Sequence, residues 1–249
     1  MIIPIKTVEE IKAMREGGKI LAHTLEEVMK KAVAGISTWE LDQFAEKTIR
    51  KFNGIPAFKG YNGFPATLCT CVDEVIVHGI PSKKTILKEG DLFTVDCGVI
   101  YKGMYTDAAR SIGIGKISEE KTLLLKTANE ALSKVQNNLR AGMKVNEIGE
   151  MVEEIVNRNG FFVISDLTGH GVGKKLHEDP IVFNFFNKSA NQVLKPGMTI
   201  AVEPIFSVGT HEMETLEDDW TIVTKDGSCA VQVENTMLIT ENGVNILTI

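Results

Sequence analysis

The stretch at residues 91–110, DLFTVDCGVIYKGMYTDAAR, decides the fold, because it places two acidic residues in a predicted buried β-hairpin. Its apolar residues favour two strands, and Lys102-Gly103 is the kind of two-residue turn that joins antiparallel neighbours. With that turn, Asp107 faces Gly98, two residues along the strand from Asp96. Both carboxylates are therefore expected on one face of the hairpin, as diagonal neighbours.

Two carboxylates buried together repel each other and lose their hydration, which is tolerable when they share a proton or bind cations. A metal site therefore accounts for Asp96 and Asp107 together. The alternative is one exposed Asp at a strand edge and one at a turn, because acidic residues are mostly exposed. For two acids alone this alternative is the commoner outcome, so the metal hypothesis depends on further ligands.

The composition describes an ordinary folded protein of enzyme size. Of the 249 residues, 43% are hydrophobic and 24% are charged, and the net charge of -6 gives no support to nucleic-acid binding. No apolar run is long enough for a transmembrane helix, and the start, MIIPIKTVEEIKAMREGG, turns charged too early for a signal peptide. Four irregularly spaced cysteines do not form a disulfide scaffold. We expect buried thiols in a reducing, cytoplasmic compartment.

Four helices are predicted in two pairs. Capping boxes at Thr7-x-x-Glu10 and Ser37-x-x-Glu40 begin the first two helices, and apolar residues follow at helical spacing. A second pair of helical patterns follows the hairpin. The expected helices cover roughly 8–33, 38–52, 118–139 and 145–157.

The two pairs indicate an internal duplication. Ala34-Gly35 in the first junction recurs as Ala141-Gly142 in the second, at an offset of 107 residues. The predicted β-rich stretches are 67–78, 92–112, 198–206 and 229–240. We therefore expect a single α/β (α+β) catalytic domain over 1–249, with internal halves at roughly 1–115 and 116–249. Helices should lie on one side of a shared sheet and a pocket on the other.

Further candidate ligands stand in three later segments. His170 lies between two glycines, which lets the backbone approach a bound group closely, and His177 follows seven residues later. Glu203 lies in an apolar strand just before a proline, where a charge is costly unless it is paired or metal-bound. Glu234 shares a strand face with Gln232, although polar strand faces usually meet solvent.

Together these segments resemble the five-ligand dinuclear site of the pita-bread metallopeptidases. The matching contexts are D-x10-D, G-H-G-x-G, E-P and Q-x-E-N-T, and the chain is similar to the type I methionine aminopeptidases over nearly its full length. The most specific segments are YNGFPATLCTCVDEVIVHGIPSKKTILKEGD at 61–91 and EDDWTIVTKDGSCAVQVENT at 217–236. The resemblance implies the pita-bread fold, in which pseudo-twofold duplicated halves, each a helix pair plus strands, surround a curved antiparallel sheet.

The resemblance also implies a methionyl aminopeptidase, a metal-dependent hydrolase that removes the initiator methionine from nascent proteins when the second residue is small. Two divalent ions, Co, Mn, Fe or Zn, are the implied cofactors. The implied metal ligands are Asp96, Asp107, His170, Glu203 and Glu234. Asp107 and Glu234 would bridge the ions. Glu203 would also accept a proton, while His177 contacts the scissile carbonyl and His78 the scissile amide nitrogen.

By position, the resemblance assigns a methionine pocket to an apolar set of side chains. These residues are Phe58, Phe64, Cys69, His78, Leu176 and Trp220. The implied partners are the N-terminal methionine peptides of nascent chains, with a transient ribosome contact. No specific nucleic acid and no membrane are expected, and we expect a monomer.

Three positions depart from the type I pattern. Thr106 precedes Asp107 where a glycine is common, which leans toward the S-D-x-T-R form of the X-Pro peptidases. Leu176 stands where an aromatic residue is common, and Phe58 where a smaller one is often found. An X-Pro aminopeptidase or dipeptidase of the same fold is therefore one alternative. A catalytically inactive pita-bread protein that binds protein or RNA is another, although such a protein has no need for five filled ligand positions.

Overall fold

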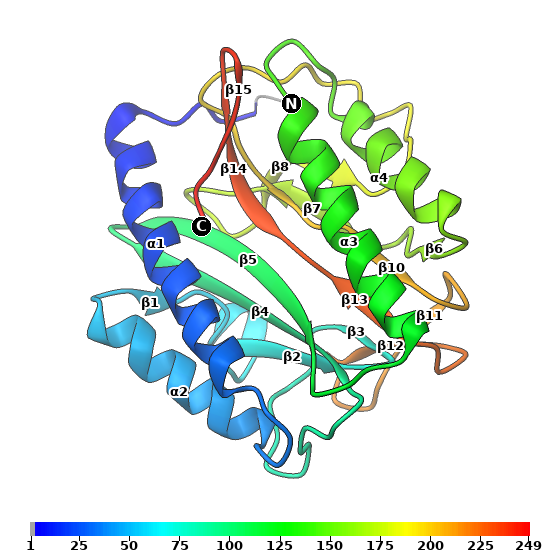
Figure 1. The fold of residues 1–249 in the computed structure, drawn as a ribbon. Coiled ribbons are helices and arrows are strands. Elements are labelled where there is room, and N and C mark those ends of the chain that lie inside the picture. The colour runs from blue at the N-terminus through cyan, green and yellow to red at the C-terminus, as the bar shows by residue number, and fades with distance from the viewer. Residues whose placement is uncertain (1–2) are drawn as a thin grey trace.

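The computed structural model describes residues 3–249, and in it two helix pairs flank a set of antiparallel strands (Figure 1). The helices are α1 (Val8–Lys31), α2 (Thr38–Lys51), α3 (Glu119–Asn138) and α4 (Asn146–Arg158), with a short 3-10 turn η1 (Tyr61–Gly63). The strands are β1 (Ile55–Pro56), β2 (Leu68–Val72), β3 (Val75–Val77), β4 (Leu92–Tyr101), β5 (Met104–Gly113), β6 (Phe162–Val163), β7 (Thr168–Gly171), β8 (Glu178–Phe183), β9 (Thr199–Val202), β10 (Ile205–Ser207), β11 (Met213–Thr215), β12 (Ile222–Thr224), β13 (Ala230–Gln232), β14 (Asn235–Thr240) and β15 (Gly243–Ile246). Each predicted helix is confirmed to within two residues at either end. Within residues 3–249, no helix combines the length and the apolar character that a membrane span requires.

The hairpin at the centre of the sequence forms as predicted. β4 and β5 pair in antiparallel register with Gly98 opposite Asp107, two residues from Asp96. Lys102 and Gly103 make the turn with φ angles of 50° and 78°, and positive φ at both central residues is the geometry of a type I′ turn. β2 pairs with β4 as well, so Asp96 lies on a strand with neighbours on both edges.

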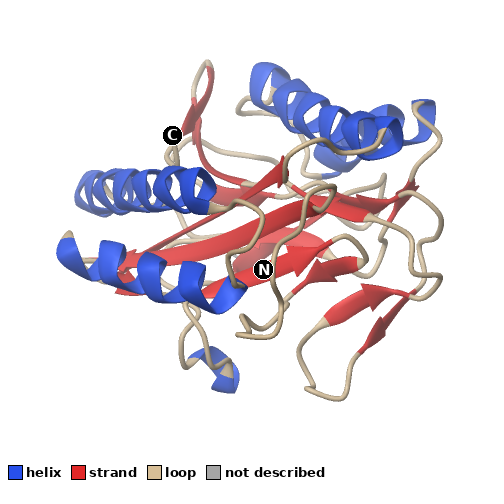
Figure 2. Cartoon of the chain, turned by 60° about the horizontal axis from the view of Figure 1, so that its bottom comes forward, coloured by secondary structure: helices blue, strands red, loops and turns tan. Residues whose placement is uncertain are grey.

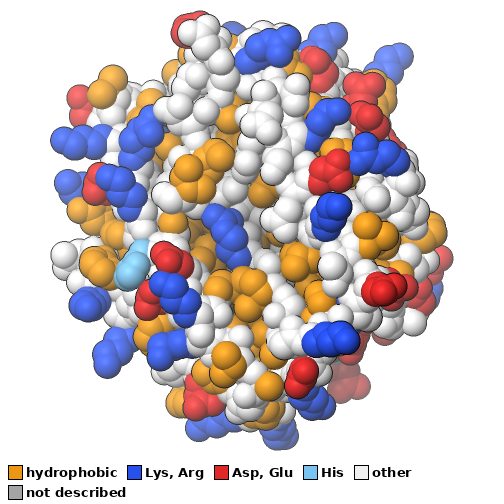
Figure 3. Space-filling model, viewed as in Figure 1, with side chains coloured by type: hydrophobic (Ala, Val, Ile, Leu, Met, Phe, Trp, Pro, Cys, Tyr) orange, Lys and Arg blue, Asp and Glu red, His pale blue; other side chains and the backbone are white. Residues whose placement is uncertain are grey.

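Each helix pair buries its apolar face on strands of its own half. α1 and α2 share one buried cluster with β4, which includes Leu21, Ile49 and Phe93. α3 and α4 share another cluster with β9 and β14, which includes Val135 and Ile200. Figure 2 shows both helix pairs on the outside of the strand layer. The outward faces carry interspersed acidic and basic side chains, with apolar side chains in small groups (Figure 3).

Gly17 and Gly18 in α1 are required by packing. A Cβ atom on Gly18 would collide with the backbone carbonyl of Leu247, and one on Gly17 would lie 3.2 Å from Cβ of Tyr101. A glycine inside a helix costs about 1 kcal/mol relative to alanine. The close approach of α1 to β4 and to the C-terminal segment explains why the chain carries two of them.

Equivalent hydrogen bonds occur in the two halves, at the offset of 107 residues seen in the sequence. The Gly35 N–H donates to the Leu87 carbonyl at 2.8 Å, and the Gly142 N–H donates to the Leu194 carbonyl at 2.9 Å. Both glycines have positive φ, 95° and 88°. These matched contacts support the division into halves at about 115/116 within one domain, which we propose as the domain organisation.

Two predicted strands are interrupted at their acidic residues. The 229–240 stretch forms β13 and β14 with Glu234 in the break between them, and Glu203 follows β9 instead of lying within it. The Glu234 N–H donates to the carbonyl of Ala109 at 3.0 Å, so the break contacts the hairpin of the other half. Within residues 3–249 the strands divide into four hydrogen-bonded sheets, where the sequence predicted one shared sheet.

Candidate active site

A cavity of about 540 Å³ collects residues from both halves of the sequence. Every residue expected to bind metal, to act in catalysis or to line the methionine pocket lies on its wall. They are Phe58, Phe64, Cys69, His78, Asp96, Asp107, His170, Leu176, His177, Glu203, Trp220 and Glu234. Residues far apart in the sequence therefore meet at one place.

The five candidate metal ligands come from different elements. Asp96 and Asp107 project from the two strands of the hairpin, and His170 projects from β7. Glu203 and Glu234 lie in the breaks that follow β9 and β13. All five are buried, with between 1% and 9% of their surface exposed. Four buried carboxyl groups around one imidazole form an unusually acidic interior.

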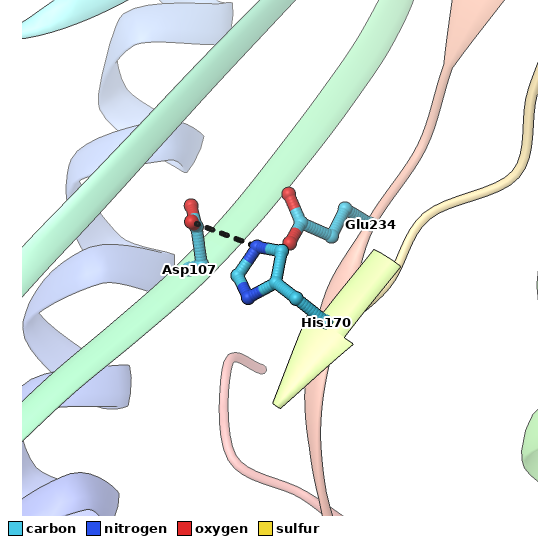
Figure 4. A group of neighbouring side chains, drawn as sticks. All are labelled: Asp107, His170 and Glu234. Carbon is cyan, nitrogen blue, oxygen red and sulfur yellow. Dashed lines mark ion pairs between the residues drawn. The ribbon is translucent and has the colours of Figure 1, made fainter. Parts of the chain in front are cut away.

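Asp107, His170 and Glu234 point toward one another (Figure 4), and one ligand atom of each lies within 4.8 Å of the others. His170 Nε2 is 3.9 Å from Asp107 Oδ2 and 3.7 Å from Glu203 Oε1. The imidazole therefore faces carboxylates from both halves. These side chains form the centre of the candidate metal site.

The hydrogen bond of His170 decides which of its nitrogens faces the acids. Nδ1 lies 2.9 Å from the carbonyl oxygen of Gly171, which can only accept, so Nδ1 carries the proton. Burial lowers the pKa of His170 to about 4, so the ring is neutral at pH 7. Nε2 then presents a lone pair to the oxygens of Asp107 and Glu203. This lone pair and these carboxylate oxygens all accept and none donates, so a cation placed between them would satisfy them together.

Unpaired oxygens point to the same conclusion. One side-chain oxygen each of Asp96, Asp107 and Glu234 is buried without a hydrogen-bond partner among residues 3–249. Burial raises the pKa of Asp96 to about 7. Burial also raises the pKa values of Asp107, Glu203 and Glu234 well above their ordinary range, and the charges of neighbouring carboxylates raise them further. Carboxylates with one imidazole are a donor set that suits divalent transition metals, so these residues fit a metal centre.

We predict from these shifts that the metal-free protein loses stability as the pH rises from about 5 to about 8. The pKa of Asp96 is about 7 in the folded chain, above its usual value of 3.8. The folded state therefore binds more protons than the unfolded state in this window, and the free energy of unfolding falls as they are lost. Denaturant unfolding with a chelator at both pH values measures the effect. Added Mn²⁺ should remove most of it by replacing the protons, and a metal-free protein that gains stability with pH would contradict the prediction.

The apolar part of the cavity is a single cluster. Phe58, Phe64, Cys69 and Leu176 are between 3% and 8% exposed and pack together. Trp220 packs against this cluster, with its ring centroid 5.1 Å from that of Phe64 in an edge-to-face arrangement. The assigned pocket residues therefore form a compact apolar wall beside the acidic group.

Two further histidines lie where the polar and apolar walls meet. The His78 ring is 6.3 Å from that of Trp220, and its backbone has a φ of 58°, which is uncommon for a residue other than glycine. The His177 ring is 4.4 Å from that of His170. Desolvation lowers the pKa values of both His78 and His177, although His177 is the more exposed of the two, so each is a neutral hydrogen-bonding group at pH 7.

Gln232 is a site residue that sequence reasoning did not assign. Its side-chain Nε2 donates to Glu203 Oε2 at 3.0 Å and lies 3.4 Å from Asp96 Oδ2. The amide therefore joins carboxylates of both halves. Its predicted position on the same strand face as Glu234 could have identified Gln232 as a site residue from the sequence.

Two other contacts gave no local signal. The Tyr61 hydroxyl lies 2.9 Å from His177 Nδ1, and 116 residues separate the two along the chain. Arg110 donates to the carbonyl oxygen of Glu234 at 2.6 Å, across a comparable separation. Only the folded chain brings these partners together.

Comparison with known proteins identifies the family of this site. The model of metallopeptidase family M24 matches residues 12–241. The chain belongs to this family. A methionine aminopeptidase of Clostridium acetobutylicum is 45% identical over 248 residues, which cover 100% of this chain and 99% of that protein. The crystal structure of a methionine aminopeptidase from Thermotoga maritima superposes with a TM-score of 0.97 at 41% identity, covering 99% of each chain. Within M24 the chain therefore groups with the bacterial methionine aminopeptidases, and the predicted pita-bread fold and family are confirmed.

A prolidase of the same fold is less similar. The prolidase from Pyrococcus furiosus has a TM-score of 0.80 and 25% identity, and the alignment covers 98% of this chain but 65% of the prolidase. The M24 fold is thus common to both groups, while full-length similarity favours the methionine aminopeptidases. The sequence around Thr106-Asp107 is similar to that of X-Pro peptidases, but this similarity does not extend to the whole chain.

Proposed function

We propose that this M24 enzyme hydrolyses the first peptide bond of nascent proteins, releasing the N-terminal methionine when the second residue is small. The observation that carries the proposal is that one cavity holds both the acidic group and the apolar wall, in a chain whose full-length relatives are methionine aminopeptidases. The apolar wall would take the methionine side chain, and the acidic group would lie at the scissile bond.

We further propose two divalent ions as cofactors, held by the carboxylates of Asp96, Asp107, Glu203 and Glu234 and by His170. Asp107 and Glu234, which lie with His170 at the centre of the group, would each be a ligand of these ions. When bound, divalent ions activate water for attack and stabilise negative charge that develops on the substrate oxygen. The native element would be Co, Mn, Fe or Zn, since several divalent ions suit such ligands.

The remaining steps fall to side chains of the chain itself. Glu203, whose pKa is raised by burial, would accept a proton from the attacking water and pass it toward the leaving amine. Neutral His177 would donate a hydrogen bond to the scissile carbonyl, where negative charge develops. His78 would hydrogen-bond the scissile amide nitrogen. A free N-terminal amine next to the ligand cluster would limit cleavage to the first residue.

We predict that Trp220→Ala weakens the selectivity of the enzyme for methionine. An apolar slot accepts an unbranched thioether, takes norleucine moderately and rejects branched leucine. Because a misplaced methylene costs about 1 to 3 kcal/mol, the Met-to-Leu ratio of kcat/KM should fall about tenfold or more. The measurement is hydrolysis of matched Met, norleucine and Leu peptides.

Trp39→Ala is the matched control, because this second tryptophan lies on α2 and is 38% exposed. It should leave the substrate ratios unchanged. If Trp220→Ala lowers only the melting temperature and keeps the ratios, Trp220 is a core residue and not part of the pocket.

The activity itself is tested with two peptides. Metal-free protein is refilled with Co²⁺, Mn²⁺, Fe²⁺ or Zn²⁺ and assayed on Met-Ala-Ser and on Ala-Pro-Ala. Release of methionine from the first supports the proposed function. Cleavage of the second alone would indicate an X-Pro peptidase, and no cleavage with any metal would indicate a binding protein.

We also propose a cytoplasmic, monomeric enzyme that contacts the ribosome transiently while it acts on nascent chains. All four cysteines are buried and unpaired, which supports a reducing compartment.

A further inference from the structure

We infer that Tyr61 is a positioning residue that holds His177 in the tautomer with its proton on Nε2, ready to donate to the substrate carbonyl. The inference rests on the proposed function of His177. It assigns a role to a residue that lines the same cavity and that the mechanism above does not use.

The contact between the two side chains carries the argument. The Tyr61 phenol oxygen lies 2.9 Å from His177 Nδ1, and the two rings meet edge to face with centroids 5.4 Å apart. A phenol O–H can donate a hydrogen bond to an unprotonated ring nitrogen. Donation from Tyr61 leaves Nδ1 without a proton, so the single proton of the neutral ring lies on Nε2.

The opposite arrangement is disfavoured on the side of the ring that faces the cavity. If His177 Nδ1 carried the proton and donated to the phenol oxygen, the phenol hydrogen would be left to solvent, because residues 3–249 offer it no other acceptor. Nε2 would then present a lone pair in a cavity already lined by six carboxyl groups. The arrangement in which Tyr61 donates pairs the phenol hydrogen with Nδ1 and leaves the Nε2 hydrogen free for the substrate carbonyl.

Both partners are held in place by their neighbours. Tyr61 begins η1, where its N–H donates to the Phe58 carbonyl at 2.9 Å. His177 precedes Glu178, whose carboxylate accepts from two N–H groups of the same loop and forms a buried ion pair with Lys6 at 2.5 Å. The contact therefore joins two anchored segments.

The neighbouring imidazole, that of His170, is in the opposite tautomer, with its proton on Nδ1. His170 donates from Nδ1 to the Gly171 carbonyl, which frees Nε2 as a lone pair toward the acidic group. His177 accepts at Nδ1, which leaves Nε2 as a donor. Two rings 4.4 Å apart thus serve opposite purposes, one as a ligand and the other as a donor. In each ring, the hydrogen-bond partner of Nδ1 decides which nitrogen carries the proton.

The first test is nitrogen NMR of the full chain at about pH 8, where an unperturbed histidine is neutral. Spectra of ¹⁵N-histidine protein, with and without added zinc, distinguish protonated from unprotonated ring nitrogens, and His177→Ala identifies the signals. Wild type should show an unprotonated Nδ1 and a protonated Nε2 at His177, and Tyr61→Phe should shift both signals toward a mixture. This readout needs no cleavage, so it separates failure of the inference from failure of the proposed function.

The second test is kinetic. Loss of one neutral hydrogen bond, worth about 0.5 to 1.5 kcal/mol, should lower kcat of Tyr61→Phe on Met-Ala-Ser about two- to tenfold with little change in KM. In a His177→Ala background the same substitution should have no further effect. Tyr105→Phe is the matched control, because Tyr105 packs against the same apolar cluster and makes no side-chain hydrogen bond within residues 3–249.

Three results would overturn the inference. One is a wild-type spectrum with the His177 proton on Nδ1, or a spectrum that Tyr61→Phe leaves unchanged. Another is an equal loss of kcat with and without His177, which would mean that Tyr61 acts elsewhere. The third is a rise in KM alone, which would make Tyr61 a wall of the binding site.

Discussion

Asp107→Ala is expected to lose bound metal and activity together while the chain stays folded. Changes to residues that merely support a ligand cost about 10- to 100-fold in metal affinity, so loss of a ligand carboxylate itself should cost more than about 100-fold. The fold should persist because the main chain of Asp107, and not its carboxylate, bonds to Thr236 Oγ1, at 2.9 Å and 2.8 Å. Elemental analysis, peptide hydrolysis and circular dichroism together measure the outcome.

Metal-free Asp107→Ala should also be more stable than metal-free wild type at pH 8. Burial, followed by the charge of Asp96, raises the pKa of Asp107 well above its usual value, so its ionised form opposes folding. Asp166→Ala is the matched control, because Asp166 lines the same cavity and is exposed. It should keep the metal. An Asp107→Ala protein with full metal content would remove Asp107 from the proposed site.

His177→Ala is expected to keep its metal and to lose turnover. The proposed role of His177 is to donate to the carbonyl oxygen as charge develops there, and removal of one such donor costs about 100-fold or more in kcat. KM should change much less, because the interaction is stronger in the transition state than with bound substrate. Initial rates on Met-Ala-Ser and metal analysis of the same sample measure both quantities.

His211→Ala is the control for that experiment, because His211 is exposed and does not line the 540 Å³ cavity. It should behave as wild type. A His177→Ala enzyme with an unchanged kcat would contradict the role of His177 and leave the metal site as proposed. Parallel loss of metal would instead make His177 part of the ligand set.

Local interactions explain why much of the fold was predictable. The hairpin register follows from the turn at Lys102-Gly103, since positive φ at both residues leaves one way to pair the strands. The capping boxes at Thr7 and Ser37 are both present and begin the helices as predicted. Each signal lies within a few residues of the structure that it specifies.

Signals that depend on a distant partner were misread or missed. Glu203 and Glu234 were predicted inside strands, but each lies just beyond a strand end. Helical spacing over 8–33 gave no reason for the two glycines in α1, yet a Cβ atom on Gly18 would collide with the Leu247 carbonyl. The alternation of apolar and polar residues in strands and their spacing in helices describe one segment at a time. These patterns therefore do not show which residues from another part of the chain pack against that segment.

The sequence by itself determined the helices, the hairpin, the types of side chain available for a metal site, and the family that their motifs resemble. Only the tertiary structure decided how these side chains meet: the lone pair of His170 toward carboxylates of both halves, and Tyr61 beside His177. The physical reason is the separation along the chain between the residues that interact. Turns and caps are satisfied within a few residues, whereas buried polar groups take partners wherever the closed chain places them.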